Sequence, residues 1–235
     1  MAAVTLLTVQ NTQSVTRVEL MNAELVRQQV EAVLKDIPPN AVKTGALGSA
    51  EIIEVVASLS FKAPLVVDPV MVSKHGHALL LEDAQEAMRK KLLPVTTLLT
   101  PNTQEAAVLL GTPVTTVEQA ESAAMQLAKL GPKAVLVKGG HLTGPEAIDV
   151  LFHDGKLTRV SSPRIDTKHT HGTGCTYASA IAANLAKGQT LIDSVRAAKA
   201  WLTQALATAP GLGQGIGPVN HFSPRGTRGG EQTQA

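Results

Sequence analysis

Apolar runs of strand length alternate with amphipathic runs of helix length along most of this chain. The apolar runs are continuous and do not alternate in polarity, which is typical of strands covered on both faces of a parallel sheet. We expect such strands at residues 3–9, 41–47, 64–70, 97–101 and 134–140. The amphipathic runs between them predict helices at 22–36, 49–59, 82–92, 103–110 and 117–130.

Local signals support several of these elements. Asn22 is a suitable cap for the first helix, and Thr116 followed by Gln119 resembles a capping box for the last of the five. After residue 145 the pattern changes to two strand-like runs around Asp154-Gly155, a dipeptide typical of hairpin turns. Two long helices are then expected, at 173–187 and 190–208.

This order of elements predicts an α/β fold. We expect a three-layer sandwich, in which a mostly parallel central sheet has helices on both faces and an antiparallel hairpin near one edge. A chain of 235 residues is long enough for one large α/β domain or two small ones.

Composition and charge narrow the class of protein. The single cysteine excludes an internal disulfide, and the longest apolar runs fall well short of the ~20 residues that span a bilayer. The first residues have neither the basic flank nor the cleavage site of a signal peptide, so we expect a cytoplasmic protein without membrane contact. A net charge of +2, 2% aromatic residues and scattered Lys and Arg argue against a nucleic-acid partner.

Polar residues and glycines follow five of the predicted strand ends. Ligands of doubly wound sheets bind at the carboxyl ends of the strands, so these residues predict one composite site. They are Lys43 and Gly45, Asp68, Asn102 and Glu105, Lys138 to Gly140, and the stretch HGTGC at 171–175.

The stretch HTHGTGCT at 169–176 places the only cysteine, Cys175, at the start of a predicted helix. Gly172 and Gly174 allow successive N–H groups to face one side, and the helix dipole adds partial positive charge. The loop is therefore suited to an anion such as a transferring phosphoryl group. The same field would lower the pKa of Cys175. The alternative is a tight turn beside a small packed residue.

Other candidates also have structural alternatives. Asn102 with Glu105 three residues later suits a helix cap, while the Glu105 carboxylate could also hold Mg²⁺ through water. Asp68 suits either an orienting role toward Mg²⁺ or a cap for the following turn. The two H-x-H pairs, at 75–77 and 169–171, have no third ligand positioned by sequence, so we expect no structural zinc site.

Six segments resemble, in order and with natural spacing, the motifs of bacterial phosphomethylpyrimidine kinases of the ribokinase superfamily. They are KTGALGS (43–49), VVDPVMVSKHG (66–76), LLTPNTQEAAVLLG (98–111), VLVKGGHL (135–142), THGTGCTYASAIAANLAKG (170–188) and GPVNHF (217–222). The resemblance implies a ribokinase-like kinase domain over 1–222. Residues 223–235 are polar, glycine-rich and without periodicity, which predicts a disordered tail. The resemblance also implies phosphorylation of 4-amino-5-hydroxymethyl-2-methylpyrimidine and then of its monophosphate, in thiamine biosynthesis. ATP and Mg²⁺ would be the cofactors, and the assembly would be a homodimer.

The resemblance also assigns site residues by position. Cys175 falls on the family's catalytic cysteine, preceded by an anion-hole loop of Gly172, Thr173 and Gly174. The residues implied for nucleotide binding are Asn102, Lys138, Gly139, Gly140 and Lys199, although a solvated lysine is the ordinary expectation for the last. Those implied for Mg²⁺, through water, are Glu105 and Asp68. Those implied for the pyrimidine are Gln10, Ala46 and Val70, with the Gln10 amide offering both a donor and an acceptor.

One departure from the family concerns the start of the chain. The family opens with a strand and a loop similar to GSDSGGGAG before the segment that matches Ala3, and this sequence contains neither. We therefore expect the sheet to lack one strand and to leave an exposed edge. Two rival functions remain. One is a kinase for a pyridoxine-type vitamer, whose ring and hydroxymethyl group resemble those of the pyrimidine. The other, suggested by the missing strand, is a non-catalytic ligand-binding remnant.

Overall fold

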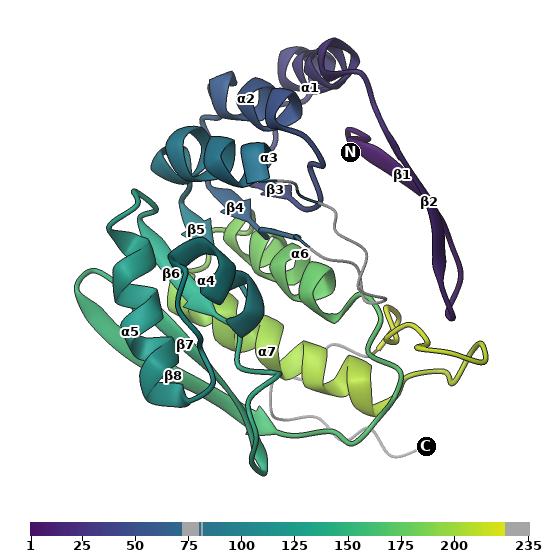
Figure 1. Cartoon of the computed structure of the whole chain (residues 1–235), viewed down its shortest axis with the longest axis vertical. Coiled ribbons are helices and arrows are strands. Elements are labelled where there is room, and N and C mark those ends of the chain that lie inside the picture. Colours follow the sequence, from purple (N-terminus) through teal and green to yellow (C-terminus); the bar gives the residue numbers. More distant parts are fainter. Residues whose placement is uncertain (72–79, 81, 224–235) are drawn as a thin grey trace, which may run out of the picture.

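The computed structural model describes residues 1–71, 80 and 82–223. Its main sheet has six strands in chain order, parallel from the first to the fourth and antiparallel thereafter (Figure 1). These strands are β3 (Val42–Thr44), β4 (Leu65–Val67), β5 (Leu98–Leu99), β6 (Ala134–Val137), β7 (Glu146–His153) and β8 (Lys156–Pro163). The predicted mostly parallel sheet and its antiparallel hairpin are confirmed, and the hairpin turns at Asp154 and Gly155 with φ of 48° and 72°.

Helices cover both faces of this sheet, as predicted (Figure 1). One layer holds α1 (Ala23–Asp36), α2 (Ala50–Ser58), α3 (Glu82–Ala87), α4 (Thr103–Leu110) and α5 (Val117–Ala128). The other holds α6 (Thr173–Leu185) and α7 (Leu191–Ala207). Successive strand residues alternate between the two cores: Val67 packs in the core of the first layer, and Val66 in the core of the second. This alternation explains why the strands have no polar face.

The strand expected at 3–9 is not part of the main sheet, and that interpretation was wrong. β1 (Leu6–Gln10) pairs antiparallel with β2 (Val15–Leu20) in a separate two-stranded sheet at one side of the molecule (Figure 1). Leu7 and Val9 on β1 are 56% and 59% exposed. Within the described residues β3 is an outer strand of the main sheet and pairs with β4 alone. Its residues are half-buried or buried.

The helix expected at 82–92 changes its hydrogen-bonding pattern along its length. After α3, a π-helical turn covers Met88–Leu92 and a 3₁₀ turn covers Leu93–Val95. Pro94 lies in this second turn, where its missing N–H ends the α-helical pattern.

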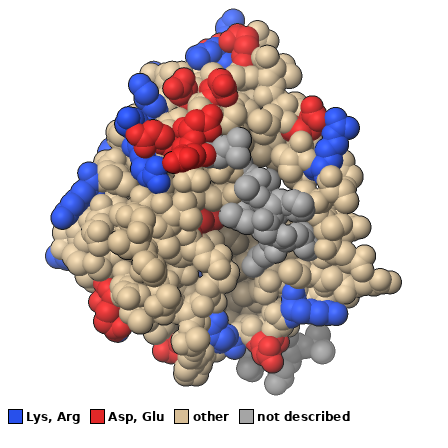
Figure 2. All heavy atoms as spheres, in the orientation of Figure 1, with Lys and Arg blue, Asp and Glu red and all other residues tan. Residues whose placement is uncertain are grey.

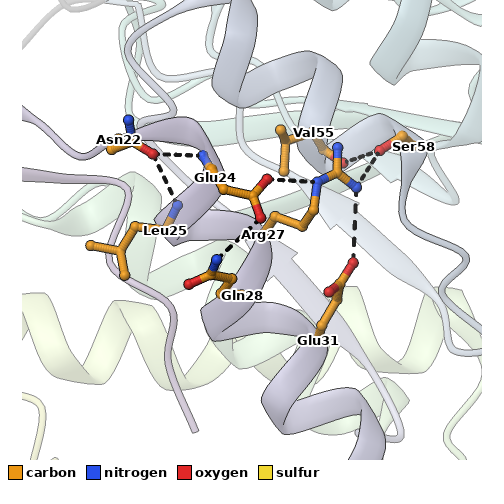
Figure 3. Close-up of polar contacts among 8 residues, drawn as sticks. All are labelled: Asn22, Glu24, Leu25, Arg27, Gln28, Glu31, Val55 and Ser58. Atoms are coloured by element: carbon orange, nitrogen blue, oxygen red, sulfur yellow. Dashed lines mark hydrogen bonds and ion pairs between the residues drawn. The ribbon is translucent and has the colours of Figure 1, made fainter.

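The cap predicted at Asn22 is confirmed. Its side-chain oxygen accepts from the backbone N–H groups of Glu24 and Leu25, at 2.9 and 3.1 Å (Figure 3). One turn later, Arg27 reaches from α1 to the Ser58 hydroxyl at the end of α2. At the start of α5 Thr116 caps as predicted, but the Gln119 side chain accepts from Thr115 and not from Thr116.

Charged side chains of both signs are mixed on the face shown in Figure 2, where acidic residues over α2 and α3 have Lys and Arg beside them. Glu86 and Lys90 form one such exposed pair, at 2.7 Å. In the described part of the chain, no helix is both long and apolar enough to cross a membrane. The tail predicted to be disordered lies outside the described residues except for Ser223, whose carbonyl accepts from the Trp201 indole at 3.1 Å.

Candidate active site

The centre of the candidate site is a buried ion pair between two strand ends. Asp68 directly follows β4, and Lys138 directly follows β6. The Lys138 ammonium donates to Asp68 Oδ1 at 2.6 Å, and the Thr100 hydroxyl donates to the same oxygen at 3.3 Å. Asp68 and Lys138 are only 1% and 9% exposed. Among the residues that the structure describes, the Asp68 side chain therefore partners Lys138 and Thr100.

The surroundings keep Lys138 charged. Burial by itself would lower the pKa of Lys138, but the Asp68 carboxylate and, after it, the Glu105 carboxylate reverse that effect. The pKa of Lys138 is consequently raised above its usual 10.5. A fixed positive charge is thus held at the carboxyl end of the sheet, as the sequence predicted.

The start of α6 lies against this ion pair. Gly172 is the N-cap, with a left-handed φ of 80° that favours glycine, and its carbonyl accepts from the Thr176 N–H at 2.8 Å. A Cβ placed on Gly174 would lie 3.1 Å from the Lys138 ammonium nitrogen and 3.8 Å from Asp68 Oδ2. The absence of a side chain at Gly174 therefore lets the helix end approach the charged pair. The predicted loop and the predicted lysine are brought together.

Cys175 lies in the first turn of α6 and reaches the surface of the site, although its sulfur is largely surrounded by site residues. Burial of its sulfur among the site residues raises its pKa above the usual 9.0, and this outweighs the lowering effect of Lys43. The Asp68 and Glu105 carboxylates act in the raising direction, and Lys138 in the lowering one. The expected lowering of the pKa was wrong, chiefly because the sulfur is desolvated among the site residues, and the Asp68 and Glu105 carboxylates offset the effect of the two lysines. Cys175 is protonated at neutral pH.

Asn102 and Glu105 form the helix cap that was the structural alternative for this pair. The Glu105 N–H donates to Asn102 Oδ1 at 2.8 Å, and the Asn102 N–H donates to Glu105 Oε2 at 2.7 Å. This capping box begins α4. Glu105 is only 8% exposed and also acts on the pKa of Lys138, so the cap and the charged cluster share its carboxylate.

Lys199 is not a solvated lysine, and its main partner was missed by the sequence analysis. Its ammonium donates to Asp149 Oδ2 at 2.7 Å, and Asp149 Oδ1 accepts from the Gly139 N–H at 2.9 Å. Lys199 and Asp149 are 7% and 2% exposed. One carboxylate thus joins α7 to the segment that follows Lys138. An acidic residue inside the apolar run of β7 was the available sequence signal.

The two glycines after Lys138 have different roles. A Cβ on Gly139 would lie 1.7 Å from the Ile148 carbonyl oxygen, so this glycine allows the backbone of β7 to pass closely. Gly140 is exposed, and no atom lies within 4 Å of its Cβ position. Only Gly140 is therefore open to a ligand.

A cavity of about 350 Å³ lies between the β1–β2 hairpin and the loop before α6. Gln10 contributes to its wall, and the Gln10 Nε2 atom is buried with no hydrogen-bond partner among the described residues. The lining residues are Thr8, Gln10, Asn11, Thr12, His171 and Pro218. Ala46 and Val70, also predicted for the substrate pocket, are not among them.

Within residues 1–71, 80 and 82–223, no group of three or more His, Cys, Asp or Glu residues is arranged to hold a metal ion. The pair at 169–171 is therefore not part of such a group, and the pair at 75–77 lies outside the described residues.

Comparisons with known proteins identify the family and the fold of this chain. The family model for phosphomethylpyrimidine kinase matches residues 1–220. The hydroxymethylpyrimidine/phosphomethylpyrimidine kinase of Streptomyces coelicolor is 48% identical over 223 residues, which cover 94% of this chain and 82% of that protein.

Two solved structures are similar in both sequence and fold. The pyridoxal kinase of Staphylococcus aureus, in complex with AMP-PCP and pyridoxal, has a TM-score of 0.86 at 31% identity, covering 94% of this chain and 81% of that one. The phosphomethylpyrimidine kinase of Clostridium difficile has a TM-score of 0.76 at 38% identity, covering 88% of this chain and 86% of that one. With its ribokinase-like sheet and the family's motifs in order, this chain belongs to the phosphomethylpyrimidine kinase family.

Proposed function

We propose that this chain transfers the γ-phosphoryl group of ATP to the hydroxymethyl group of 4-amino-5-hydroxymethyl-2-methylpyrimidine, and then to the monophosphate so formed. The observation that carries the proposal is the contact between a buried, charged Lys138 and the N-terminus of α6. Phosphoryl transfer needs little covalent chemistry from the protein but needs positioned positive charge where negative charge develops.

The first turn of α6 supports this role. The Thr173 N–H and hydroxyl both donate to the Thr170 carbonyl, at 3.3 and 2.7 Å. By their position in the first turn, the N–H groups of Gly174 and Cys175 have no acceptor inside the helix. They are therefore available, together with the Lys138 ammonium, for the oxygens of the transferring phosphoryl group.

ATP is the proposed phosphoryl donor, and Mg²⁺ its partner. Asp68 and Glu105 fit such an ion, because Mg²⁺ in proteins is commonly bound by one or two carboxylates, with phosphate oxygens and water completing its coordination. Asp68 Oδ1 already accepts from Lys138 and Thr100, which leaves Oδ2 on the side of α6. When bound, the ion would neutralise charge on the phosphates.

The acceptor alcohol is proposed to bind in the cavity beside Gln10. The buried and unpartnered Gln10 amide nitrogen is a donor for a ring nitrogen of an aminopyrimidine. His171, in the same cavity wall, directly precedes Gly172, so a bound alcohol would lie next to the anion loop. Cys175 is then the proposed acceptor of the hydroxyl proton. With a raised pKa its thiolate is the minor form at neutral pH, and the rate should increase with pH.

The rival substrate is pyridoxal, because a pyridoxal kinase is among the most similar folds. A ring carrying a hydroxymethyl group is common to both substrates, so the fold does not distinguish them. The greater sequence identity to hydroxymethylpyrimidine kinases favours the pyrimidine.

The test removes the positive charge of Lys138, which is proposed to bind the transferring phosphoryl group. The wild-type chain is given MgATP and the pyrimidine alcohol, and the monophosphate and diphosphate are separated by chromatography. Lys138→Met should lower kcat/KM by roughly 10²–10³-fold, the usual effect of removing one charge-stabilising group. Lys133→Met, at an exposed position before β6, is the matched control and should behave as wild type. Equal turnover for the Lys138 variant, or no product from the wild type, would contradict the proposal.

A further inference from the structure

The loop that follows Lys138 is held by one side chain from a distant part of the chain. Arg164 directly follows β8 and is half-buried. Its Nε donates to the Gly144 carbonyl at 2.8 Å, and its Nη1 donates to the Gly140 carbonyl at 2.8 Å. Its Nη2 donates to the carbonyls of Leu142 and Glu146, at 2.5 and 3.1 Å.

One guanidinium group therefore gathers four backbone carbonyls from within seven residues. The Arg164 backbone N–H adds a fifth contact, to the Pro145 carbonyl at 2.9 Å. Because these carbonyls point inward at a common donor, the loop from 140 to 146 is wrapped around the Arg164 side chain. Loops of this kind are ordinarily mobile, since few of their backbone groups have partners.

The start of the same loop is fixed separately. The Gly139 N–H donates to the buried Asp149 carboxylate at 2.9 Å, and β7 passes against the Gly139 backbone. Removal of the Arg164 side chain would therefore release residues 140–144 and leave Gly139 in place, because the Arg164 N–H still binds the Pro145 carbonyl and Glu146 belongs to β7. Of Gly139 and Gly140, only Gly140 is exposed, and its carbonyl is the first along the chain to accept from Arg164.

We propose that Arg164 is a positioning residue for the nucleotide: it fixes the loop 140–146, and with it Gly140, which lies two residues after Lys138 in the chain. This inference rests on the proposed function. Arg164 also precedes the segment that runs to Gly172, so one side chain connects the loop after β6 with the approach to the anion loop. A planar fork of five N–H donors suits four spread acceptors, whereas a lysine ammonium with three donors at one point does not.

The experiment compares Arg164→Ala and Arg164→Lys with the control Arg159→Ala. Arg159 lies on β8 and is half-exposed, with ion pairs to Glu118 and Glu121 on α5. In Arg164→Ala the KM for ATP should rise roughly 10- to 100-fold, while the KM for the pyrimidine alcohol stays within about twofold. Arg164→Lys should show a smaller rise in the same direction. Millimolar guanidinium should restore the low KM for ATP in the Ala variant, because it refills the vacated site.

Hydrogen exchange of the ligand-free protein gives a second readout that needs no activity. The Leu142 N–H, which donates to the Gly139 carbonyl at 3.0 Å, should exchange about tenfold faster in Arg164→Ala. The Gly139 N–H, held by Asp149, should be unchanged. If Arg164→Ala does not fold, Arg164→Lys provides the same two readouts.

Unchanged exchange at Leu142 would overturn the proposal, and so would faster exchange with an unchanged KM for ATP. Equal increases in the KM for ATP and for the alcohol would overturn it as well, since they would indicate a general loss of structure. If the wild type transfers no phosphoryl group, the proposed function fails. The affinity of the free protein for ATP, measured by calorimetry with the same variants, then decides the role of Arg164.

Discussion

Two ion pairs of nearly equal length, one buried in the site and one on the surface, test how burial changes the contribution of an ion pair to stability. The Lys138–Asp68 distance is 2.6 Å and the Lys90–Glu86 distance is 2.7 Å. The side chains of the first pair are 11% and 1% exposed, and those of the second are 69% and 50% exposed. Asp68→Asn and Glu86→Gln remove one charge from each pair with little change of shape.

The buried variant should be much less stable than the surface variant. Breaking a buried pair by removing one partner costs about 3–5 kcal/mol, because the remaining charge is left in a site that excludes water. The amide oxygen that replaces the carboxylate at position 68 can still accept from Lys138, so we expect a loss of about 3 kcal/mol, at the lower end of this range. For a chain of this size that corresponds to a melting temperature lower by roughly 6–12 °C. Glu86→Gln should cost far less, because water screens an exposed pair and readily solvates the lysine left behind.

The pH dependence of the stability difference between wild type and Asp68→Asn tests whether Lys138 is the charge left unpaired in the variant. Its pKa is raised in the folded protein, so its contribution to stability is fully present below its ordinary pKa of 10.5. That contribution is lost as pH rises through the folded value. The stability gap between wild type and Asp68→Asn should therefore be constant from about pH 7 to 9 and should narrow above about pH 10.5.

Thermal melting followed by circular dichroism, at several pH values, measures both quantities. Equal losses for Asp68→Asn and Glu86→Gln would refute the reasoning, because burial would then make no difference. A gap that widens above the ordinary lysine pKa of 10.5 would contradict the assignment to Lys138.

Two further predictions concern glycine and cysteine positions. Gly139→Ala should lower the free energy of unfolding by about 3 kcal/mol or more, because its Cβ would lie 1.7 Å from the Ile148 carbonyl oxygen. Gly140→Ala has open space at that position and should change the free energy of unfolding by less than about 1 kcal/mol. Equal melting curves for the two variants would contradict this prediction. The kcat/KM of the wild type should increase with pH toward the raised pKa of Cys175, and Cys175→Ala should lose that increase and about 10²–10⁴ in rate. A Cys175→Ala variant with the wild-type rate and pH profile would show that the thiol only packs.

Much of the fold was predictable because its signals are local. The Asp154-Gly155 turn fixed the hairpin, and the Asn22 cap fixed the start of α1. The strand at Leu6–Gln10 was assigned to the wrong sheet because its apolar residues look like those of a buried strand. Leu7 and Val9 are nevertheless exposed, and β2 was missed because its VTRVEL sequence is broken by Arg17 and Glu19.

The site was predictable to the extent that parallel strands bring their carboxyl ends together. That rule placed Asp68 and Lys138 in one site, and the structure joins them directly. The partners of Lys199 and Arg164 could not be predicted in this way. The Lys199–Asp149 pair depends on how α7 packs against β7, and the four carbonyls bound by Arg164 depend on the path of a loop. The direction of the Cys175 pKa shift likewise depends on how far the folded site encloses the sulfur, and then on charged residues from other elements.

The most direct test of the proposed function is a competition between its two candidate substrates. The wild-type chain is incubated with MgATP and equal concentrations of the hydroxymethylpyrimidine and of pyridoxal, and the initial rates of formation of both phosphorylated products are measured in the same sample. We predict that the pyrimidine monophosphate forms faster and is then converted to the diphosphate. Faster phosphorylation of pyridoxal, or no phosphorylation of either alcohol, would contradict the proposed function.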